Sequence, residues 1–261
     1  MKISIITPSF NQGSFIQEAI ESVLAQQYAN VEHIIVDNCS TDGTSEILAR
    51  YPHLKVICEK DKGQSDALNK GFKMAAGDII GWLNADDKYL PGCFDHVLEG
   101  FTKNPEFDLL YGDYRFVDAQ GKLIRVRKEL GFDAFMLKYL HVLYIPTTTT
   151  FFRRKVFDED NFLDIEYHYA MDYEFYVRLA SLGYWFGHIP WLMADFRWHA
   201  QAKSQQIAKA KAEMEKALLS HDQMLRRLPA VLRVLISHLF MFLARAKRTV
   251  LKFCHGAYFI K

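Results

Sequence analysis

The stretch WLNADDKYLPG at residues 82–92 contains an amide and two adjacent carboxylates, Asn84, Asp86 and Asp87, between an apolar run and a Pro-Gly turn. Two carboxylates this close repel each other unless one is protonated or a cation lies between them. Mg²⁺ and Mn²⁺ prefer oxygen ligands, and proteins commonly hold them with one or two carboxylates together with phosphate groups. The stretch therefore predicts a divalent-metal site that receives a phosphorylated ligand.

The order of these residues suggests a division of roles. Residues i and i+2 of an extended chain point the same way, so Asn84 and Asp86 are expected on one side and Asp87 on the other. Asp86 is then the leading metal ligand, and Asn84 contacts a ribose or supports the site. Asp87 either binds the metal or orients the site, and a third reading is that it only caps the helix expected near Pro91.

Polar clusters follow three other apolar runs, KISIIT at 2–7, EHIIVD at 32–37 and LKVICE at 54–59. Ligands of open parallel sheets bind at the carboxyl ends of the strands, so clusters at four strand ends predict one shared binding site. Any single cluster could instead make a turn or a helix cap, and Asp37 could cap the helix expected near 41–44. The clusters are Thr7 and Pro8 with Asn11, then Asp37, then Asp61 to Asp66, and finally Asn84 to Asp87.

Each of these four runs leads into a segment with helical periodicity. Four successive strand-helix units predict an α/β fold with a mostly parallel sheet and helices on both faces. The pattern changes after residue 105, where we expect a hairpin turning near 119–121, a helix at 170–183 and a strand pair around 184–199. Residues 203–255 look helical, with a break near Pro229. We expect a domain at 1–200, with halves 1–104 and 105–200, and a helical extension at 201–261.

Composition narrows the class of protein further. The chain has 261 residues, and 32 Lys and Arg against 31 Asp and Glu leave a net charge of +1, without the basic excess typical of nucleic-acid binding. Its 4 cysteines form no CxxC pair and no secretory signal pattern precedes the first run, which favours the cytoplasm. The apolar segment 228–244 is shorter than the roughly 20 residues of a membrane span and contains Arg233 and His238.

The C-terminal segment differs in charge from the rest, because no acidic residue follows Asp222. A helical projection places Leu228, Val231, Leu232, Leu235, Ile236, Leu239, Leu243 and Phe253 on one side and Arg226, Arg233, Arg245, Arg248 and Lys252 on the other. Such a basic amphipathic helix predicts contact of residues 226–261 with an anionic membrane surface. The alternative is packing on the protein's own body or on a second subunit.

The sequence contains neither a GxGxxG motif after the first strand nor a GxxxxGK[ST] motif, so a dinucleotide-binding Rossmann fingerprint and a P-loop are not supported. The motifs TPSFNQ at 7–12, IIVDNCSTDGT at 34–44, KGQSDALNKG at 62–71 and WLNADD at 82–87 instead resemble family 2 of the glycosyltransferases. These are inverting enzymes with the GT-A fold, many of which build bacterial surface polysaccharides. The resemblance continues more loosely to FRWHAQAKS at 196–204. It implies a GT-A catalytic domain over 1–200.

The resemblance implies roles for the donor-side residues. Thr7, Pro8 and Asn11 match the loop that contacts the nucleoside, Asp37 the carboxylate that reads the base, and Asp66 a further nucleoside contact. Asp37 points to a uridine donor, because its carboxylate can accept from an imide N–H.

The resemblance also implies a metal site and a base. Asn84, Ala85, Asp86 and Asp87 match the DxDD-like metal motif, Asp172 the general base, and His199 a late residue that closes over metal and diphosphate. Lys203 and Arg197 could add positive charge at the phosphates. Asn84 stands where the family has an Asp, and Met171 where it has a Glu. Asp172 has a second reading as a helix N-cap.

The resemblance implies a metal-dependent inverting glycosyltransferase. With Mn²⁺ or Mg²⁺ it would move a sugar from a nucleoside-diphosphate sugar, expected to be UDP-linked, to a hydroxyl of a glycan or lipid-linked glycan. It would act at the inner face of the cytoplasmic membrane, and a homo-oligomer is compatible with the sequence. The alternatives are an inactive nucleotide-sugar-binding protein, which retention of Asp86 and Asp172 argues against, and a sugar nucleotidyltransferase, which lacks support without a Gly-rich first loop.

Overall fold

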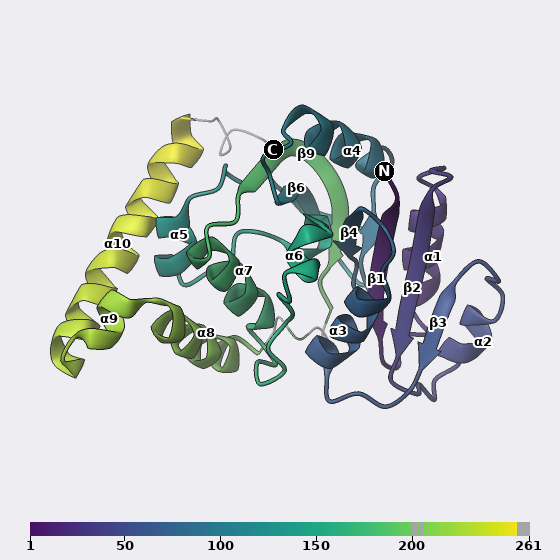
Figure 1. The fold of residues 1–261 in the computed structure, drawn as a ribbon, viewed down its shortest axis with the longest axis horizontal. Coiled ribbons are helices and arrows are strands. Elements are labelled where there is room, and N and C mark those ends of the chain that lie inside the picture. The colour runs from purple at the N-terminus through teal and green to yellow at the C-terminus, as the bar shows by residue number, and fades with distance from the viewer. Residues whose placement is uncertain (200–202, 204–205, 255–261) are drawn as a thin grey trace.

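A computed structural model describes residues 1–199, 203 and 206–254. Its centre is a nine-stranded sheet of order β3-β2-β1-β4-β8-β6-β9-β5, with β7 paired to β6 (Figure 1). The strands are β1 Ile3–Ser9, β2 Val31–Asp37, β3 Lys55–Cys58, β4 Ile79–Trp82, β5 Lys88–Tyr89, β6 Leu109–Val117, β7 Leu123–Arg127, β8 Phe151–Arg153 and β9 Phe186–Arg197. The helices are α1 Ile16–Leu24, α2 Thr44–Leu48, α3 Gln64–Met74, α4 Cys93–Lys103, α5 Ala134–Tyr139, α6 Lys155–Asp158, α7 Met171–Ser181, α8 Ile207–His221, α9 Gln223–Arg227 and α10 Ala230–Cys254, with a 3₁₀ turn at Thr147–Thr149.

The first four strand-helix units form the parallel part of the sheet, as the sequence predicts. Strands β3, β2, β1 and β4 are parallel, and Ser9 pairs with Asp37, which pairs with Cys58, so their carboxyl ends are aligned. Strands β1 and β4 are buried along their whole length, because helices cover both faces. Helices α1 and α4 pack on one face, whereas α3 and α7 pack on the other. The predicted α/β fold with a mostly parallel sheet is confirmed.

The second half adds strands of mixed direction. The predicted hairpin is β6 and β7, and Gly121 in its turn has φ 80°, a left-handed conformation that glycine adopts readily. The predicted strand pair around 184–199 is wrong, because β9 is one long strand that pairs in parallel with β6. Pro190 lies where the register of β9 shifts, which accommodates a residue that cannot donate to the ladder.

The helices after residue 205 pack on the main body. Met214 and Leu218 of α8, Leu225 of α9 and Ala244 of α10 join the same hydrophobic core as helix α7. The break near Pro229 falls between α9 and α10, as the sequence predicts. Helices on both sides of residue 200 therefore share one core. The domain boundary expected at this residue remains a prediction.

Helix α10 matches the helical projection only in part, because Ile236, predicted on the apolar side, packs against the core while most other residues of that side are exposed. The basic residues Arg248 and Lys252 turn toward the body, where both pair with the buried carboxylate of Glu129 at 3.3 Å. The apolar side chains Val231, Leu232, Val234, Leu235, Leu239, Phe242, Leu243, Val250 and Phe253 are exposed. The helix forms one edge of the molecule, at the opposite end from β3 and α2 (Figure 1). Among the described residues, no helix is long and apolar enough to cross a membrane.

Candidate active site

A cleft of about 600 Å³ lies at the carboxyl ends of β1, β3 and β4. Its lining includes nine of the residues predicted from the sequence, namely Pro8, Asn11, Asn84, Ala85, Asp86, Asp87, Asp172, His199 and Lys203. The cleft thus brings together strand ends from the first half and residues more than 80 positions later in the chain. This convergence is what a shared binding site at the sheet edge requires.

Asp86 and His199 meet in the cleft. The Oδ2 atom of Asp86 lies 3.0 Å from Nε2 of His199, and the His199 ring contacts Phe15 with ring centroids 4.9 Å apart. Asp86 follows β4 and His199 follows β9, so two strands at different places in the sheet deliver the pair. A carboxylate and an imidazole at this separation offer one oxygen and one nitrogen ligand to a divalent cation.

Asp87 is buried and bonded to protein donors on both oxygens. Its Oδ2 accepts from the Thr148 hydroxyl at 2.5 Å and from Asn84 Nδ2 at 3.0 Å, whereas Oδ1 accepts from the Arg197 backbone N–H at 2.8 Å. Burial, together with the neighbouring Asp86 charge, raises the pKa of Asp87 well above its usual range. These contacts support the second predicted role of Asp87, orienting the site, more than metal ligation. It does not cap α4, whose N-cap is Gly92.

The expected alternation of side chains along residues 84–87 is wrong. Strand β4 ends at Trp82 and the chain then turns, with the Asp87 N–H bonded to the Asn84 carbonyl at 3.1 Å, so Asn84 faces Asp87. The Asn84 side-chain oxygen accepts from Trp82 Nε1 at 2.9 Å and from Gln64 Nε2 at 3.0 Å. Asn84 therefore holds the turn to its surroundings, and its predicted ribose contact remains a prediction.

The donor set fits a divalent cation held by two protein ligands. Asp86 and His199 face one another on the cleft wall, and the cleft leaves space for further oxygen ligands from a diphosphate. Among the described residues there is no group of three or more His, Cys, Asp or Glu that could hold a metal ion. The described part of the chain therefore does not supply a complete set of metal ligands, and a bound diphosphate would have to complete the coordination.

Asp172 lies at the start of helix α7, on the second-half side of the cleft. The N-cap of α7 is Ala170, so the alternative reading of Asp172 as the cap is wrong; its Oδ1 accepts from the Tyr173 N–H at 2.8 Å. Burial raises the pKa of Asp172 to about 6, although that N–H and the Lys203 charge act in the opposite direction. A carboxylate with this pKa is ionised at neutral pH and is a stronger base than an exposed Asp.

Glu213 of helix α8 fixes the loop that leads to Asp172. Its carboxylate accepts the backbone N–H groups of His168, Tyr169 and Ala170 at 3.0, 2.7 and 2.8 Å. These donors lie at the N-terminus of α7, where helical N–H groups lack intrahelical partners and negative charge is favourable. The Lys203 ammonium also donates to the His168 carbonyl at 3.1 Å and to Gln64 at 3.2 Å. Residues beyond 200 therefore position the loop before Asp172.

Three predicted residues do not line the cleft. Thr7 is fully buried with its hydroxyl 2.9 Å from Nε2 of His33. Asp37 is also buried and accepts from the backbone and the hydroxyl of Ser40 at 2.7 and 2.6 Å, while Asp66 accepts from the Lys62 N–H at 3.0 Å. The Thr7 contact joins two neighbouring strands, and those of Asp37 and Asp66 are local turn and helix-start contacts. The nucleoside roles of all three residues remain predictions.

The structure also changes the picture of the cationic residues. Arg197, expected as a charge for phosphates, is buried, and its guanidinium donates to the carbonyls of Asp86 and Ala119 and to the Glu18 carboxylate at 2.8–2.9 Å. It therefore builds the wall behind Asp86. The cleft is also lined by four residues for which the sequence motifs predict no role, Gln64, Thr147, His168 and Tyr169. The polar run TTTT at 147–150 was the sequence signal that could have pointed to Thr147.

The fold and the cleft define an α/β protein of the GT-A type. The family model for glycosyl transferase family 2 matches residues 4–160. The chain therefore belongs to glycosyl transferase family 2, the family that the motifs predict. An uncharacterized glycosyltransferase of Rickettsia bellii is 31% identical over 228 residues, which cover 81% of this chain and 32% of that protein.

Two solved structures share the fold at low sequence identity. The structure of S. aureus TarS 1-349 in complex with UDP-GlcNAc has a TM-score of 0.68 at 17% identity and covers 92% of this chain and 72% of that one. The mannosyltransferase PcManGT from Pyrobaculum calidifontis, in complex with GDP-Man and Mn²⁺, has a TM-score of 0.65 at 16% identity and covers 98% and 75%. The chain spans 22–32% of the length of the first curated relatives that it matches.

Proposed function

We propose that this protein is an inverting glycosyltransferase that transfers a sugar from a nucleoside-diphosphate sugar to an acceptor hydroxyl. The observation that carries the proposal is the meeting of Asp172 with the Asp86 and His199 pair in one cleft at the carboxyl ends of the parallel strands. Inverting transfer needs a base at the acceptor and positive charge at the leaving diphosphate. The cleft offers Asp172 for the first and the Asp86 and His199 pair for the second.

Asp172 is the base in this proposal. The acceptor hydroxyl gives its proton to the Asp172 carboxylate while its oxygen bonds to the anomeric carbon. The bond from that carbon to the diphosphate oxygen breaks, and the nucleoside diphosphate leaves from the opposite face. The pKa of Asp172, raised to about 6 by burial, suits a base that works near neutral pH.

Asp86 and His199 would hold a divalent cation, Mn²⁺ or Mg²⁺, which when bound neutralises charge on the leaving diphosphate. Lys203 lines the same cleft and adds a cationic side chain. Asp87, through its bonds to Thr148 and the Arg197 backbone, holds the turn that carries Asp86. Support for the metal also comes from PcManGT, which was solved with GDP-Man and Mn²⁺.

The donor is proposed to be UDP-linked. TarS, which shares the fold, was solved with UDP-GlcNAc, whereas PcManGT was solved with GDP-Man, so both nucleotides belong in the test. The proposal is tested by incubating the purified protein with UDP-, GDP- and dTDP-sugars, with Mn²⁺ or with EDTA, and measuring nucleoside-diphosphate release. Metal-dependent release from one donor class supports transferase chemistry. Metal-dependent binding without release would indicate the alternative, an inactive nucleotide-sugar-binding protein.

We also propose that helix α10 rests on an anionic membrane surface, with a lipid-linked glycan as the acceptor. Its outward side carries nine large apolar side chains, with Val231 76% and Phe242 67% exposed, and Arg226 and Arg245 are exposed beside them. Burying such a face in the interfacial region of a bilayer is favourable, and nearby cations favour anionic lipids.

Flotation with vesicles of phosphatidylcholine and phosphatidylglycerol tests this contact. The Leu235→Ser/Phe242→Ser variant should lose most of the bound fraction, whereas the exposed pair Leu24→Ser/Val56→Ser, on α1 and β3 away from α10, should not. If the unchanged protein sediments as a dimer and Leu235→Ser/Phe242→Ser as a monomer, the apolar face of α10 is covered by a second copy of the chain instead of a membrane.

A further inference from the structure

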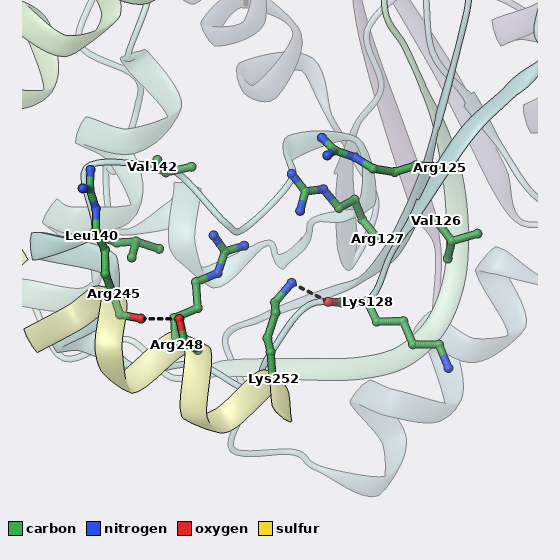
Figure 2. Close-up of a pocket in the computed structure, with 10 residues that line it drawn as sticks. Arg125, Val126, Arg127, Lys128, Leu140, Val142, Arg245, Arg248 and Lys252 are labelled. Atoms are coloured by element: carbon green, nitrogen blue, oxygen red, sulfur yellow. Dashed lines mark hydrogen bonds between the residues drawn. The ribbon is translucent and has the colours of Figure 1, made fainter. Parts of the chain in front are cut away.

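A second cavity, of about 390 Å³, lies between the end of β7, the segment after α5 and the last turns of α10 (Figure 2). It shares no lining residue with the cleft that holds Asp172. Its walls are Arg125, Val126, Arg127, Lys128, Leu140, Val142, Arg245, Arg248, Thr249 and Lys252. Segments more than 100 residues apart in the chain thus build it together.

The charge of this cavity is one-sided, since six of its ten lining residues are Lys or Arg and none is acidic. The carboxylate of Glu129, adjacent in sequence to the β7 wall, lies 3.3 Å from both Arg248 and Lys252. Within the described part of the chain, Arg125, Arg127, Lys128 and Arg245 make no ion pair. One carboxylate therefore faces an excess of positive charge, and like charges gathered in one place repel.

Two donors in this cluster are buried without an acceptor. The Nε atoms of Arg127 and Arg248 are shielded from solvent and have no hydrogen-bond partner among the described residues. A buried donor left unpaired is costly, and such groups usually find a partner in a ligand, an ion or a water. In Figure 2 the guanidinium groups of Arg127 and Arg248 and the ammonium group of Lys252 point toward the same space, whereas the Lys128 side chain points away.

The electrostatics of neighbouring groups agree with this picture. Burial lowers the pKa of Lys252, and the charges of Arg248 and Arg127 lower it further against the opposing effect of Glu129. Burial and the Arg127 charge likewise lower the pKa of Arg125. Positive charge in the cavity is therefore incompletely compensated by the protein itself.

We propose that this cavity is a binding site for a phosphate or diphosphate group, separate from the donor cleft. Arginine guanidinium groups bind phosphate oxygens through paired, charge-assisted hydrogen bonds, and the two unpaired Nε donors lie where such an acceptor would go. No aromatic side chain lines the cavity, so it offers no surface on which a nucleobase could stack. The group is either the headgroup of a lipid at the surface that α10 faces or a soluble phosphate compound.

The test uses the full chain in EDTA, so that a metal-bound diphosphate in the donor cleft does not contribute. Inorganic diphosphate is titrated by calorimetry, and flotation compares phosphatidylcholine vesicles with and without about one fifth phosphatidate. The variant Arg125→Gln/Arg245→Gln removes two exposed cations of the cavity, and Arg248→Gln removes a guanidinium with an unpaired Nε. The control Lys73→Gln/Lys122→Gln makes the same charge change at exposed residues that line neither the cavity nor the donor cleft. Thermal melting verifies that each variant is folded.

We expect diphosphate binding that weakens about tenfold or more in both cavity variants and less than twofold in the control, because hydrogen bonds to charged groups are strong. Binding of phosphatidate vesicles beyond that of phosphatidylcholine alone identifies a lipid headgroup as the source, and binding of free diphosphate alone identifies a soluble one. The proposal is overturned if neither probe binds, or if the control loses as much affinity as Arg125→Gln/Arg245→Gln, which would reveal only diffuse attraction to positive charge.

Discussion

The two walls of the donor cleft are built in different ways. The N-terminal wall, residues 8–12, 61–64 and 82–87, consists of loops that directly follow β1, β3 and β4. The C-terminal wall is formed by Thr147, residues 168–172, Phe196, His199 and Lys203. These residues come from separate elements that long-range hydrogen bonds hold together, such as those of Glu213 to the 168–170 backbone. The first wall is a direct result of the parallel sheet, whereas the second depends on contacts that form only when the whole chain has folded.

Because the two walls differ, Asp86 and Asp172 are held in place by different parts of the chain. Asp86 lies in a turn that is held in place by hydrogen bonds of Asp87 with Thr148 and Arg197. Residues later in the chain therefore help to stabilise the N-terminal wall. Asp172 is carried by α7, whose first turn Glu213 of α8 bonds from outside the predicted domain. Variants at Asp86 and at the loop before Asp172 should therefore fail differently, the first in metal and donor binding and the second in the transfer step.

Apart from replacement of the base itself, the largest loss is expected for Asp86→Asn. Replacing this carboxylate leaves His199 without its charged partner and removes the strongest oxygen ligand, so kcat/KM should fall about 100-fold or more and Mn²⁺ affinity with it. Steady-state rates against Mn²⁺ concentration and direct Mn²⁺ binding by electron paramagnetic resonance provide the measurement. Asp95→Asn, an exposed carboxylate on α4, serves as the control. Unchanged Mn²⁺ affinity would remove Asp86 from the metal site.

A smaller effect is expected for Glu213→Ala on the C-terminal wall. Three backbone donors before α7 lose their acceptor, the loop carrying Asp172 loosens, and kcat should fall about tenfold while the dissociation constant of the donor changes little. The matched control is Glu215→Ala, an exposed residue on the same helix. Equal loss in both variants, or weaker donor binding in step with kcat, would mean that Glu213 does not act through the base.

The smallest effect concerns the pH dependence of the reaction. Because Asp172 must be ionised to accept a proton and its pKa is raised to about 6, kcat/KM should be flat above that pH and fall about tenfold per unit below it. Lys203 favours the ionised form, so Lys203→Gln should move the midpoint to higher pH by a fraction of a unit. A midpoint that stays near 4, or one that moves down in Lys203→Gln, would contradict the assignment of Asp172.

The N-terminal wall could be predicted well from the sequence because its information is local. Each buried strand ends in a polar loop, and the aligned carboxyl ends of β1, β2 and β3 follow from the strand-helix repeat. The turn at 84–87 could not be predicted, since its geometry is set by Thr148 and Arg197, which are distant in sequence. Asn84 and Asp86 therefore do not lie in the extended chain that was expected to point both side chains the same way.

The C-terminal wall was predictable only where the family resemblance reached it, at Asp172, His199 and Lys203. Strand β8 was not predicted, because a strand of only three residues has too little periodicity to be recognised in the sequence. In the sheet it pairs with β4 and β6. The helical projection of α10 grouped most of its exposed apolar residues but misplaced Ile236, which packs against the core, and it could not reveal which face packs inward. That choice depends on Glu129, whose buried carboxylate pairs with Arg248 and Lys252.

Comparing kcat with donor affinity in Asp172→Asn decides whether Asp172 is the base. Asparagine keeps the size of the side chain but cannot accept the acceptor proton, so kcat should fall about 1,000-fold, whereas the dissociation constant of the donor should stay within about twofold. Asp158→Asn, at an exposed position of α6, should leave both unchanged. Equal loss of donor binding and turnover in Asp172→Asn, or turnover that survives, would contradict the assignment of Asp172 as the base.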